Sequence, residues 1–333
     1  MLFAIKYNAM NGSESVLYSL DVLMARIEDE IHELEIADAD LIESSQWYQS
    51  SRPDRRKMLE KSAEASLHRA PRTRGPHRRR IEVNDAGTVE AARAIAHTPL
   101  SVLVENSESD GALIKFAVKA FATTAAWELC FGAGTLCTPP ALQIESRGGH
   151  GELLKLLRAR LRESAERGVD PRLVVITDCD GEWAGDVKVH AQELRDECAS
   201  ASVPCPPLNK RTAENYVPDI VWTAWAAERQ HTSVRPAVEA LLRLSYQQRD
   251  HVCIGPSNTD PWNSSEPAVR SLFANVTGQD WELLKTANLK GRGSSGIASI
   301  LETHSSVLAA AEFQVRDYQG DLEAVVRCIE DGL

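Results

Sequence analysis

Four acidic residues lie where two apolar segments of the sequence end. The segment VLVE ends in Glu105, with Asp110 shortly after it, and the segment VVITDCD contains Asp178 and Asp180. Carboxylates brought together repel each other, and a cation that prefers hard oxygen ligands, Mg²⁺ or Mn²⁺, relieves that repulsion. Two such ions roughly 4 Å apart can activate water and stabilise the leaving oxygen of a phosphodiester. These residue types therefore predict metal-dependent hydrolysis of nucleic acid.

The acids can meet only if the segments that carry them are neighbouring strands of one sheet. Apolar runs predict strands at 101–105, 127–131 and 172–178, with a possible edge strand at 203–208. Amphipathic or capped segments predict helices from Ser109 or Asp110 to Phe121 and at 148–168, 186–200 and 213–229. This alternation is typical of a parallel sheet, and function in such sheets gathers beyond the carboxyl ends of the strands.

The order of these motifs resembles the Toprim domain, in particular the Toprim half of OLD-family nucleases and their small defence-associated relatives. The family shows an apolar strand ending in Glu, an Asp at the next helix start and a later strand ending in Asp-x-Asp. Here these are VENSESDGALIKFAV at 104–118 and VVITDCDGEW at 174–183. A basic residue before Glu-Asn-Tyr often follows, here NKRTAENYVP at 209–218. The resemblance covers about residues 100–230.

The resemblance implies a role for each matching acid. Glu105 corresponds to the Toprim glutamate, which helps bind metal and takes part in acid–base steps. Asp178 and Asp180 correspond to the metal-binding pair, and Asp110 to the acid at the helix start. The implied cofactor is Mg²⁺ or Mn²⁺, held by Glu105, Asp110, Asp178 and Asp180.

The segment after Glu105 departs from the family pattern. Asn106 stands where the family has Gly, and five positions rather than four separate Glu105 from Asp110. Glu108 is therefore an alternative to Asp110 as the second acid.

The resemblance also implies a cation near the scissile phosphate. Lys210 or Arg211 resembles the basic residue that steadies a phosphate, and Glu214 resembles the acid that follows it. Related nucleases often carry the basic residue later in the chain, so Lys290 is a rival to Lys210. In the implied reaction Lys210 or Arg211 stabilises the developing negative charge.

The flanking regions are expected to be mostly helical. Apolar residues recur at helical spacing from Val16 to Leu34 and predict one long helix over 14–45 with an acidic opposite face. After residue 230, helices are expected at 235–249, 266–275, 297–312 and 320–330. The fold class is thus α/β: a helical N-terminal region with a basic segment at 1–97, a Toprim-like domain with a parallel sheet at 98–230, and a helical C-terminal region at 231–333.

The net charge and the motifs limit which partners the chain is expected to have. With a net charge of −11, the chain would meet nucleic acid, more readily DNA than RNA, through a local basic patch or through bound metal. The basic block from Arg52 to Arg80 is either that patch or a counter-charge to the acidic helix. Full OLD-family proteins carry an ATPase half, and this sequence has no P-loop motif, so the resemblance implies a separate ATPase or sensor as protein partner. Self-association is left open. The seven cysteines form no CxxC zinc pattern, and no export signal or apolar membrane span is seen, which favours a cytoplasmic protein without a membrane partner.

Two other functions compete with an endonuclease in anti-phage defence. A Toprim-fold scaffold or regulatory subunit would bind a partner without cutting and would not need the acids. The segment DCDG also matches the opening motif of haloacid-dehalogenase phosphatases, in which the first Asp is a nucleophile. That family usually carries a downstream Gly-Asp-x-x-x-Asp motif, which this sequence lacks.

Overall fold

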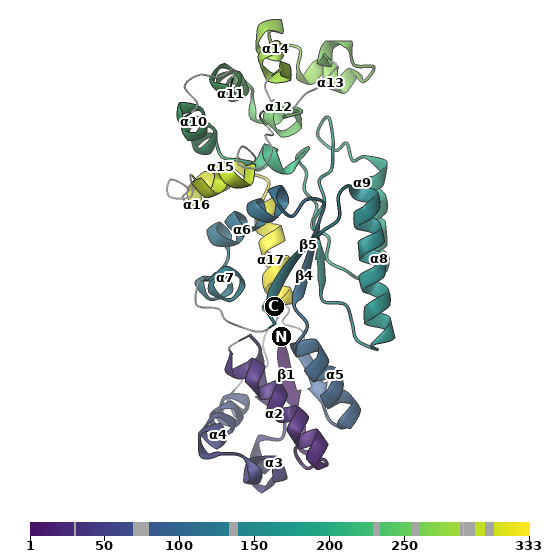
Figure 1. The fold of residues 1–333 in the computed structure, drawn as a ribbon, viewed down its shortest axis with the longest axis vertical. Helices are drawn as coiled ribbons and strands as arrows, with labels where there is room; N and C mark the ends of the chain where they lie inside the picture. Colours follow the sequence, from purple (N-terminus) through teal and green to yellow (C-terminus); the bar gives the residue numbers. More distant parts are fainter. Residues whose placement is uncertain are drawn as a thin grey trace.

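The computed structural model describes most of the chain, and all structural statements below refer to that part (Figure 1). The described residues are 1–29, 31–68, 80–132, 139–228, 234–254, 260–286, 289, 297–303 and 310–333. Three parts follow one another along the long axis: an N-terminal lobe, a central sheet with its helices, and a group of C-terminal helices.

The N-terminal lobe is built on a parallel three-stranded sheet in the order β2-β1-β3. Its strands are β1 (Leu2–Ile5), β2 (Glu33–Ile36) and β3 (Arg80–Val83). Helices α2 (Glu14–Glu28) and α5 (Ala86–Ala96) pack on each other, and α4 (Pro53–Leu67) packs on β2. Short elements complete the lobe: α1 (Tyr7–Met10), the 3₁₀ turn η1 (Ala39–Ser44) and α3 (Gln46–Ser50).

The expectation of one helix over 14–45, and of a purely helical N-terminal region, is wrong. Helix α2 ends at Glu28 and strand β2 follows. The segment Glu33-Leu34-Glu35-Ile36 alternates polar and apolar residues, which is the period of a strand with one buried face. Leu34 also fits a helical repeat continued from α2, so spacing alone could not separate the two structures.

The described part of the basic block partly neutralises the acids of this lobe. Arg55 lies 2.6 Å from Asp21 and 3.4 Å from Glu28, and Arg80 lies 2.8 Å from Glu35. These contacts favour the counter-charge interpretation for Arg55 and Arg80. The residues between 69 and 79 lie outside the described part of the chain.

The central sheet is parallel, with the order β5-β4-β6. Its strands are β4 (Leu100–Val104), β5 (Leu142–Ser146) and β6 (Leu173–Val175). Helices α6 (Ser109–Phe121) and α17 (Asp321–Gly332) cover one face, and α8 (His150–Glu166) and α9 (Val189–Ser200) cover the other (Figure 1). Along β4, Val102 and Val104 pack toward α6 and α17 while Leu103 packs toward α8. Strand β4 is therefore buried on both faces, as its continuous apolar run predicts.

The second strand of this sheet is not where the sequence places it. Residues 127–131 belong to helix α7 (Thr124–Phe131), whose N-cap Thr123 accepts a hydrogen bond from the Ala126 N–H. A capping threonine followed by helix-forming residues outweighs a short apolar run. The strand lies later, at β5. Residues 203–208 form no assigned strand, but the Val175 N–H donates to the Pro204 carbonyl at 2.9 Å, so this segment runs beside β6.

The helix expected at 213–229 is divided into η2 (Ala213–Tyr216) and α10 (Asp219–Glu228). The C-terminal region is helical, as expected, but the helix expected at 235–249 is divided into α11 (Val234–Arg243) and α12 (Tyr246–His251), and α14 (Gly278–Thr286) was not expected. The other elements before α17 are η3 (Pro261–Asn263), α13 (Pro267–Leu272), α15 (Ile297–Thr303) and α16 (Ala310–Arg316). Helix α17 then returns to the central sheet and contacts β4, β6 and α6.

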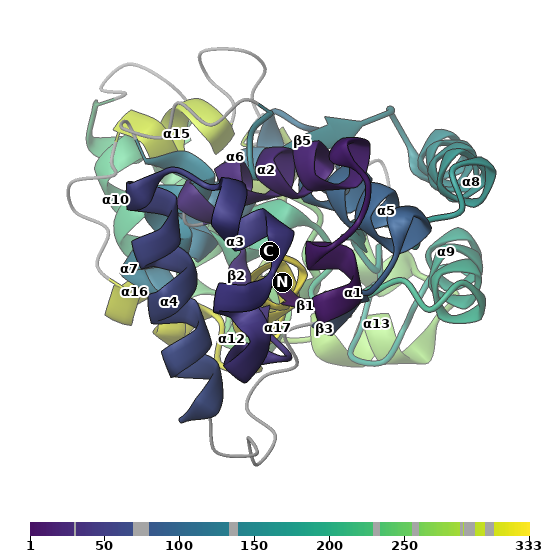
Figure 2. The ribbon, with the colours of Figure 1, turned by 90° about the horizontal axis from the view of Figure 1, so that it is seen from below.

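Two buried arginines join the N-terminal lobe to the central sheet. Arg172 donates to the carbonyls of Thr98 and Gly332 at 2.5 and 2.9 Å, and Arg26 donates to the Pro139 carbonyl at 3.0 Å. The chain termini meet at the same junction, where the Met1 amino group donates to the Leu333 carbonyl at 2.9 Å (Figure 2). Among the described helices, none is both long and apolar enough to cross a bilayer.

Candidate active site

The loop after β4 turns the Asp110 carboxylate back toward the end of the strand. The Asn106 N–H donates to Asp110 Oδ2 at 2.9 Å, and the Asn106 side chain accepts from the Glu108 N–H at 2.9 Å. Asparagine thus closes a short side-chain turn, a role for which it is suited. Ser109 Oγ donates to the other Asp110 oxygen at 2.9 Å.

This loop separates the two rival acids. Asp110 lies in the first turn of α6, and two groups of the loop hold its carboxylate. Glu108 is exposed and lines a different surface hollow together with Lys115 and Glu302. Burial and the charges of Glu105 and Glu214 raise the pKa of Asp110, which therefore lies beside two other predicted site acids.

The loop after β6 carries the Asp178–Asp180 pair in a tightly folded conformation. Thr177 Oγ1 donates to Glu105 Oε1 at 3.4 Å, which brings the ends of β4 and β6 together. Asp180 has a positive φ of 52°, which is uncommon for a residue other than glycine. Gly181 follows because a Cβ there would lie 2.1 Å from the Asp186 carbonyl oxygen.

A third segment, 209–216, supplies Glu214 and runs beside the Asp178–Asp180 loop. The Asp180 N–H donates to the Arg211 carbonyl at 3.0 Å. Thr212 and Asn215 cap η2 reciprocally, and the Asn215 amide also donates to the carbonyls of Arg249 and Val252. This network fixes the short turn that carries Glu214, whose side chain is buried.

Burial and the neighbouring carboxylates raise the pKa of two of these acids, Asp178 and Asp110. For Asp178, burial raises the pKa well above its usual range, and the charges of Asp110, Glu214, Glu105 and Asp180 raise it further. For Asp110, burial and the charges of Glu105 and Glu214 raise the pKa to about 6, against the hydrogen bonds from Asn106 and Ser109. The other four predicted acids therefore lie within electrostatic reach of Asp178.

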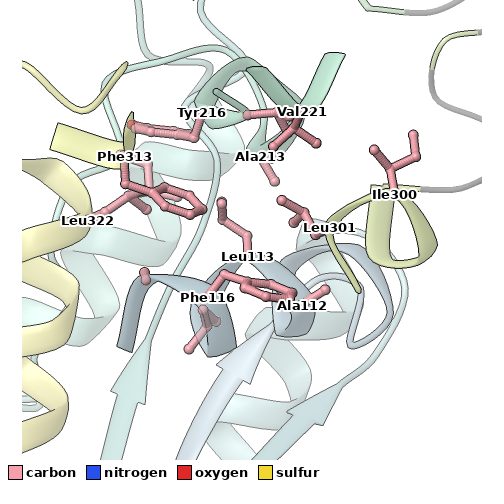
Figure 3. Close-up of a cluster of buried hydrophobic side chains, with 14 of the residues drawn as sticks. Ala112, Leu113, Phe116, Ala213, Tyr216, Val221, Ile300, Leu301, Phe313 and Leu322 are labelled. Atoms are coloured by element: carbon pink, nitrogen blue, oxygen red, sulfur yellow. The ribbon is translucent and has the colours of Figure 1, made fainter. Parts of the chain in front are cut away.

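The apolar side chains around a small cavity explain why the carboxylates of Asp110 and Asp178 are shielded from water. Asp110 and Asp178 line it together with Leu113, Ala213, Leu322 and other apolar residues. Figure 3 shows Leu113, Ala213 and Leu322 within one buried hydrophobic cluster contributed by α6, η2 and α17. Two acids thus sit where apolar packing meets the edge of the sheet, and a group in such a place holds its proton more tightly.

Lys210 lies in a buried ionic network rather than beside these acids. Its side chain is fully buried, and Nζ donates to Asp250 Oδ1 at 2.6 Å. Arg316 contacts the same oxygen at 2.6 Å, and the Tyr318 hydroxyl donates to Asp250 Oδ2 at 2.6 Å. Burial and the nearby Arg316 lower the Lys210 pKa. In this position Lys210 is out of reach of a bound phosphate.

Arg211 is the better placed of the two predicted cations. Its side chain is partly exposed, with NH2 3.8 Å from Glu182, and its carbonyl accepts from the Asp180 N–H. Lys290, the rival cation, lies outside the described residues.

The sequence did not predict the residues that contact two of the predicted site residues, Lys210 and Asp180. Asp250 is one of them, and nothing in the sequence around it pairs it with a lysine forty positions earlier. His190 is another, with Nε2 3.9 Å from Asp180 Oδ2. Its place in the first turn of α9, after a loop that carries acids, was the signal available.

No group of three or more His, Cys, Asp or Glu side chains in the described residues is already arranged around one point in a way that could hold a metal ion. The donor set is nevertheless of the kind that divalent cations need, because it consists of carboxylate oxygens on two adjacent loops. A metal ion would have to draw these carboxylates closer together.

Comparisons with protein-family models, with curated proteins and with solved structures give no match to this chain. The Toprim resemblance therefore rests on the motifs of the sequence alone.

Proposed function

We propose that the chain is a metal-dependent nuclease that hydrolyses phosphodiester bonds of DNA, or of RNA, at the acids of the central sheet. One observation supports the proposal: Glu105, Asp110, Asp180 and Glu214, which come from three segments, all lie within electrostatic reach of Asp178 in the loop after β6. The neighbouring charges that raise the pKa of Asp178 are all carboxylates. Such an arrangement opposes folding unless protons or cations neutralise it.

A divalent cation suits this cluster better than a structural ion pair does. Glu105, Asp110, Asp178 and Asp180 would hold Mg²⁺ or Mn²⁺, whose charge when bound would polarise a phosphate and activate water. The repulsion that the ion relieves would supply the force that draws the carboxylates together. The loops after β4 and β6 carry these acids, and binding residues are commonly found on such loops.

The other groups of the site have roles that follow from their positions. Arg211 is a partly exposed cation beside Asp180 and would stabilise charge on the scissile phosphate. In the metal-free protein, Asp110 has a pKa of about 6 and exchanges its proton close to neutral pH. The resemblance extends the proposal to anti-phage defence, with a separate ATPase or sensor as partner.

The test is cleavage of supercoiled plasmid by the purified chain with Mg²⁺, with Mn²⁺ and with EDTA. We expect nicking that needs the metal and that Asp178→Asn or Asp180→Asn abolishes. Glu193→Gln, an exposed acid on α9, is the matched control and should leave nicking unchanged. The same variants should lose metal binding in calorimetry.

Two other outcomes would replace the proposal. The absence of both cleavage and metal binding would identify a scaffold or regulatory subunit. Hydrolysis of p-nitrophenyl phosphate without plasmid nicking would identify a phosphatase of the haloacid-dehalogenase type.

A further inference from the structure

Two exposed tyrosines lie side by side near the acidic cluster, although they are far apart in the sequence. Tyr246 begins α12, and Tyr318 follows α16. Their exposed fractions are 45% and 51%, their ring centroids are 6.2 Å apart and their ring planes are tilted by 51°, so a flat ligand can stack on one ring while the other ring borders it. Large aromatic side chains are rarely left in water together without a use, because burying them is favourable.

A buried cation lies beneath each ring. Lys210 Nζ is 4.6 Å from the centroid of the Tyr318 ring, and its side chain is fully buried. The Arg249 guanidinium is 4.7 Å from the centroid of the Tyr246 ring and is also buried. Both cations are buried, whereas each ring keeps about half of its surface exposed to solvent.

The cations are themselves held in place. Lys210 donates to Asp250, and Arg249 contacts Asp219. The Tyr318 hydroxyl donates to the same Asp250, so this ring is fixed at its far end as well as over its face. The pair is therefore preorganised, which lowers the entropy lost when a ligand binds.

Backbone contacts connect this pair to the acidic cluster. The Arg211 N–H donates to the Asp250 carbonyl at 2.8 Å, and the Asp180 N–H donates to the Arg211 carbonyl at 3.0 Å. His251, the last residue of α12, contacts the Gly181 carbonyl at 3.2 Å. Tyr246 is at the other end of this helix, about 7.5 Å along its axis at 1.5 Å per residue. Helix α12 and Arg211 thus link the tyrosine pair to the loop that carries Asp180.

The chemistry of the pair selects its ligand. A cation beneath a ring already uses the negative charge of the π face, so a second cation on the outer side is repelled. A neutral aromatic face is favoured instead, and nucleobases are stacked by tyrosines in this way in proteins that bind single strands.

We propose that Tyr246 and Tyr318 form a stacking platform for an unpaired nucleobase of single-stranded nucleic acid, next to the bond that the acids would cut. This proposal rests on the proposed function for its biological sense but not for its test. The platform makes single-stranded or frayed nucleic acid the preferred substrate.

The test is fluorescence-anisotropy binding without metal, in the presence of EDTA, on the non-cleaving Asp178→Asn background. The probes are a labelled dA20, a labelled dT20 and a 20-mer of abasic sugar-phosphate. We expect Tyr246→Ala to weaken binding of dA20 by roughly 5- to 150-fold, the range for loss of one stacked base. Tyr246→Trp keeps a ring and should retain binding. Tyr18→Ala, a tyrosine on α2 that is 65% exposed, is the matched control and should change nothing.

The probes separate stacking from charge. Tyr246→Ala should leave the weak binding of the abasic strand unchanged, because that strand offers only phosphates. The inference is overturned if dA20 and the abasic strand bind equally, if Tyr246→Ala and Tyr18→Ala behave alike, or if no probe binds. Ring-dependent binding by a protein that never cuts plasmid would support the platform while removing the nuclease proposal, so the two can fail separately.

Discussion

Lys210 Nζ and Asp250 Oδ1 are 2.6 Å apart in the protein interior, and this contact decides the position of the lysine. Arg316 meets the same carboxylate oxygen at 2.6 Å. One buried carboxylate therefore contacts two buried cations, and the buried Asp317 lies within electrostatic reach of Lys210. Removal of Asp250 leaves both cations without that partner.

Replacing Asp250 with alanine should destabilise the protein strongly. Breaking a buried ion pair by removing one partner costs roughly 3–5 kcal/mol, since the other charge stays desolvated. Lys210→Met should cost less, because it removes a buried charge and keeps an apolar chain of similar length. Urea unfolding followed by circular dichroism measures both, with the exposed Asp196→Ala on α9 as control. Equal midpoints for Asp250→Ala and wild type would show that the network does not stabilise the fold.

Asp178→Asn should raise the melting temperature of the metal-free protein. Burial and four neighbouring carboxylates disfavour a charge at this position, and the amide removes that cost. The same variant should lose the stabilisation that Mg²⁺ or Mn²⁺ gives to the wild type. Thermal unfolding in EDTA and in about 10 mM Mg²⁺ or Mn²⁺ compares the wild type with Asp178→Asn. A lower melting temperature in EDTA would contradict the electrostatic account of the cluster.

The metal-free protein should lose stability as the pH rises from about 4 to about 6 and beyond. Asp110 has a folded-state pKa of about 6 against an ordinary value of 3.8. A raised pKa gives stability that is fully present below the lower value and is lost as the pH passes the higher one. The difference corresponds to on the order of 3 kcal/mol. Unfolding free energies measured in EDTA across this range should fall for wild type and fall less for Asp110→Asn; parallel curves would count against the assignment.

Arg211→Ala should slow plasmid cleavage more than it weakens binding. Loss of one group that stabilises developing charge typically lowers kcat by roughly 100- to 1,000-fold. Arg211→Lys keeps the charge without the planar fork and should recover part of the rate. Arg158→Ala, which removes an exposed ion pair with Glu197 between α8 and α9, is the control. A purely higher KM with unchanged kcat would instead make Arg211 a binding residue.

The sequence alone predicted that Glu105 and Asp178 follow two strands of one parallel sheet. Strand β4 overlaps the predicted segment 101–105 and β6 lies within 172–178, because a strand buried on both faces needs a continuous apolar run. In a parallel sheet the carboxyl ends of neighbouring strands share one edge, so Glu105 and Asp178 could be expected to meet before any contact was known. Glu214 was expected beside them only from the family resemblance of the segment 209–218.

The tertiary structure decided what local patterns leave open. Residues 127–131 became a helix because Thr123 caps it, and residues 33–36 became a strand because β1 offers a partner in register. Lys210 donates a hydrogen bond to Asp250 in the interior, and the ring of Tyr246 lies beside that of Tyr318. Local sequence fixes the backbone preference and the burial of each segment, whereas the partner of a buried charge or an exposed ring depends on which distant segments pack against it. Such contacts are selected by the free energy of desolvation and packing across the whole chain, and no spacing within a single segment encodes them.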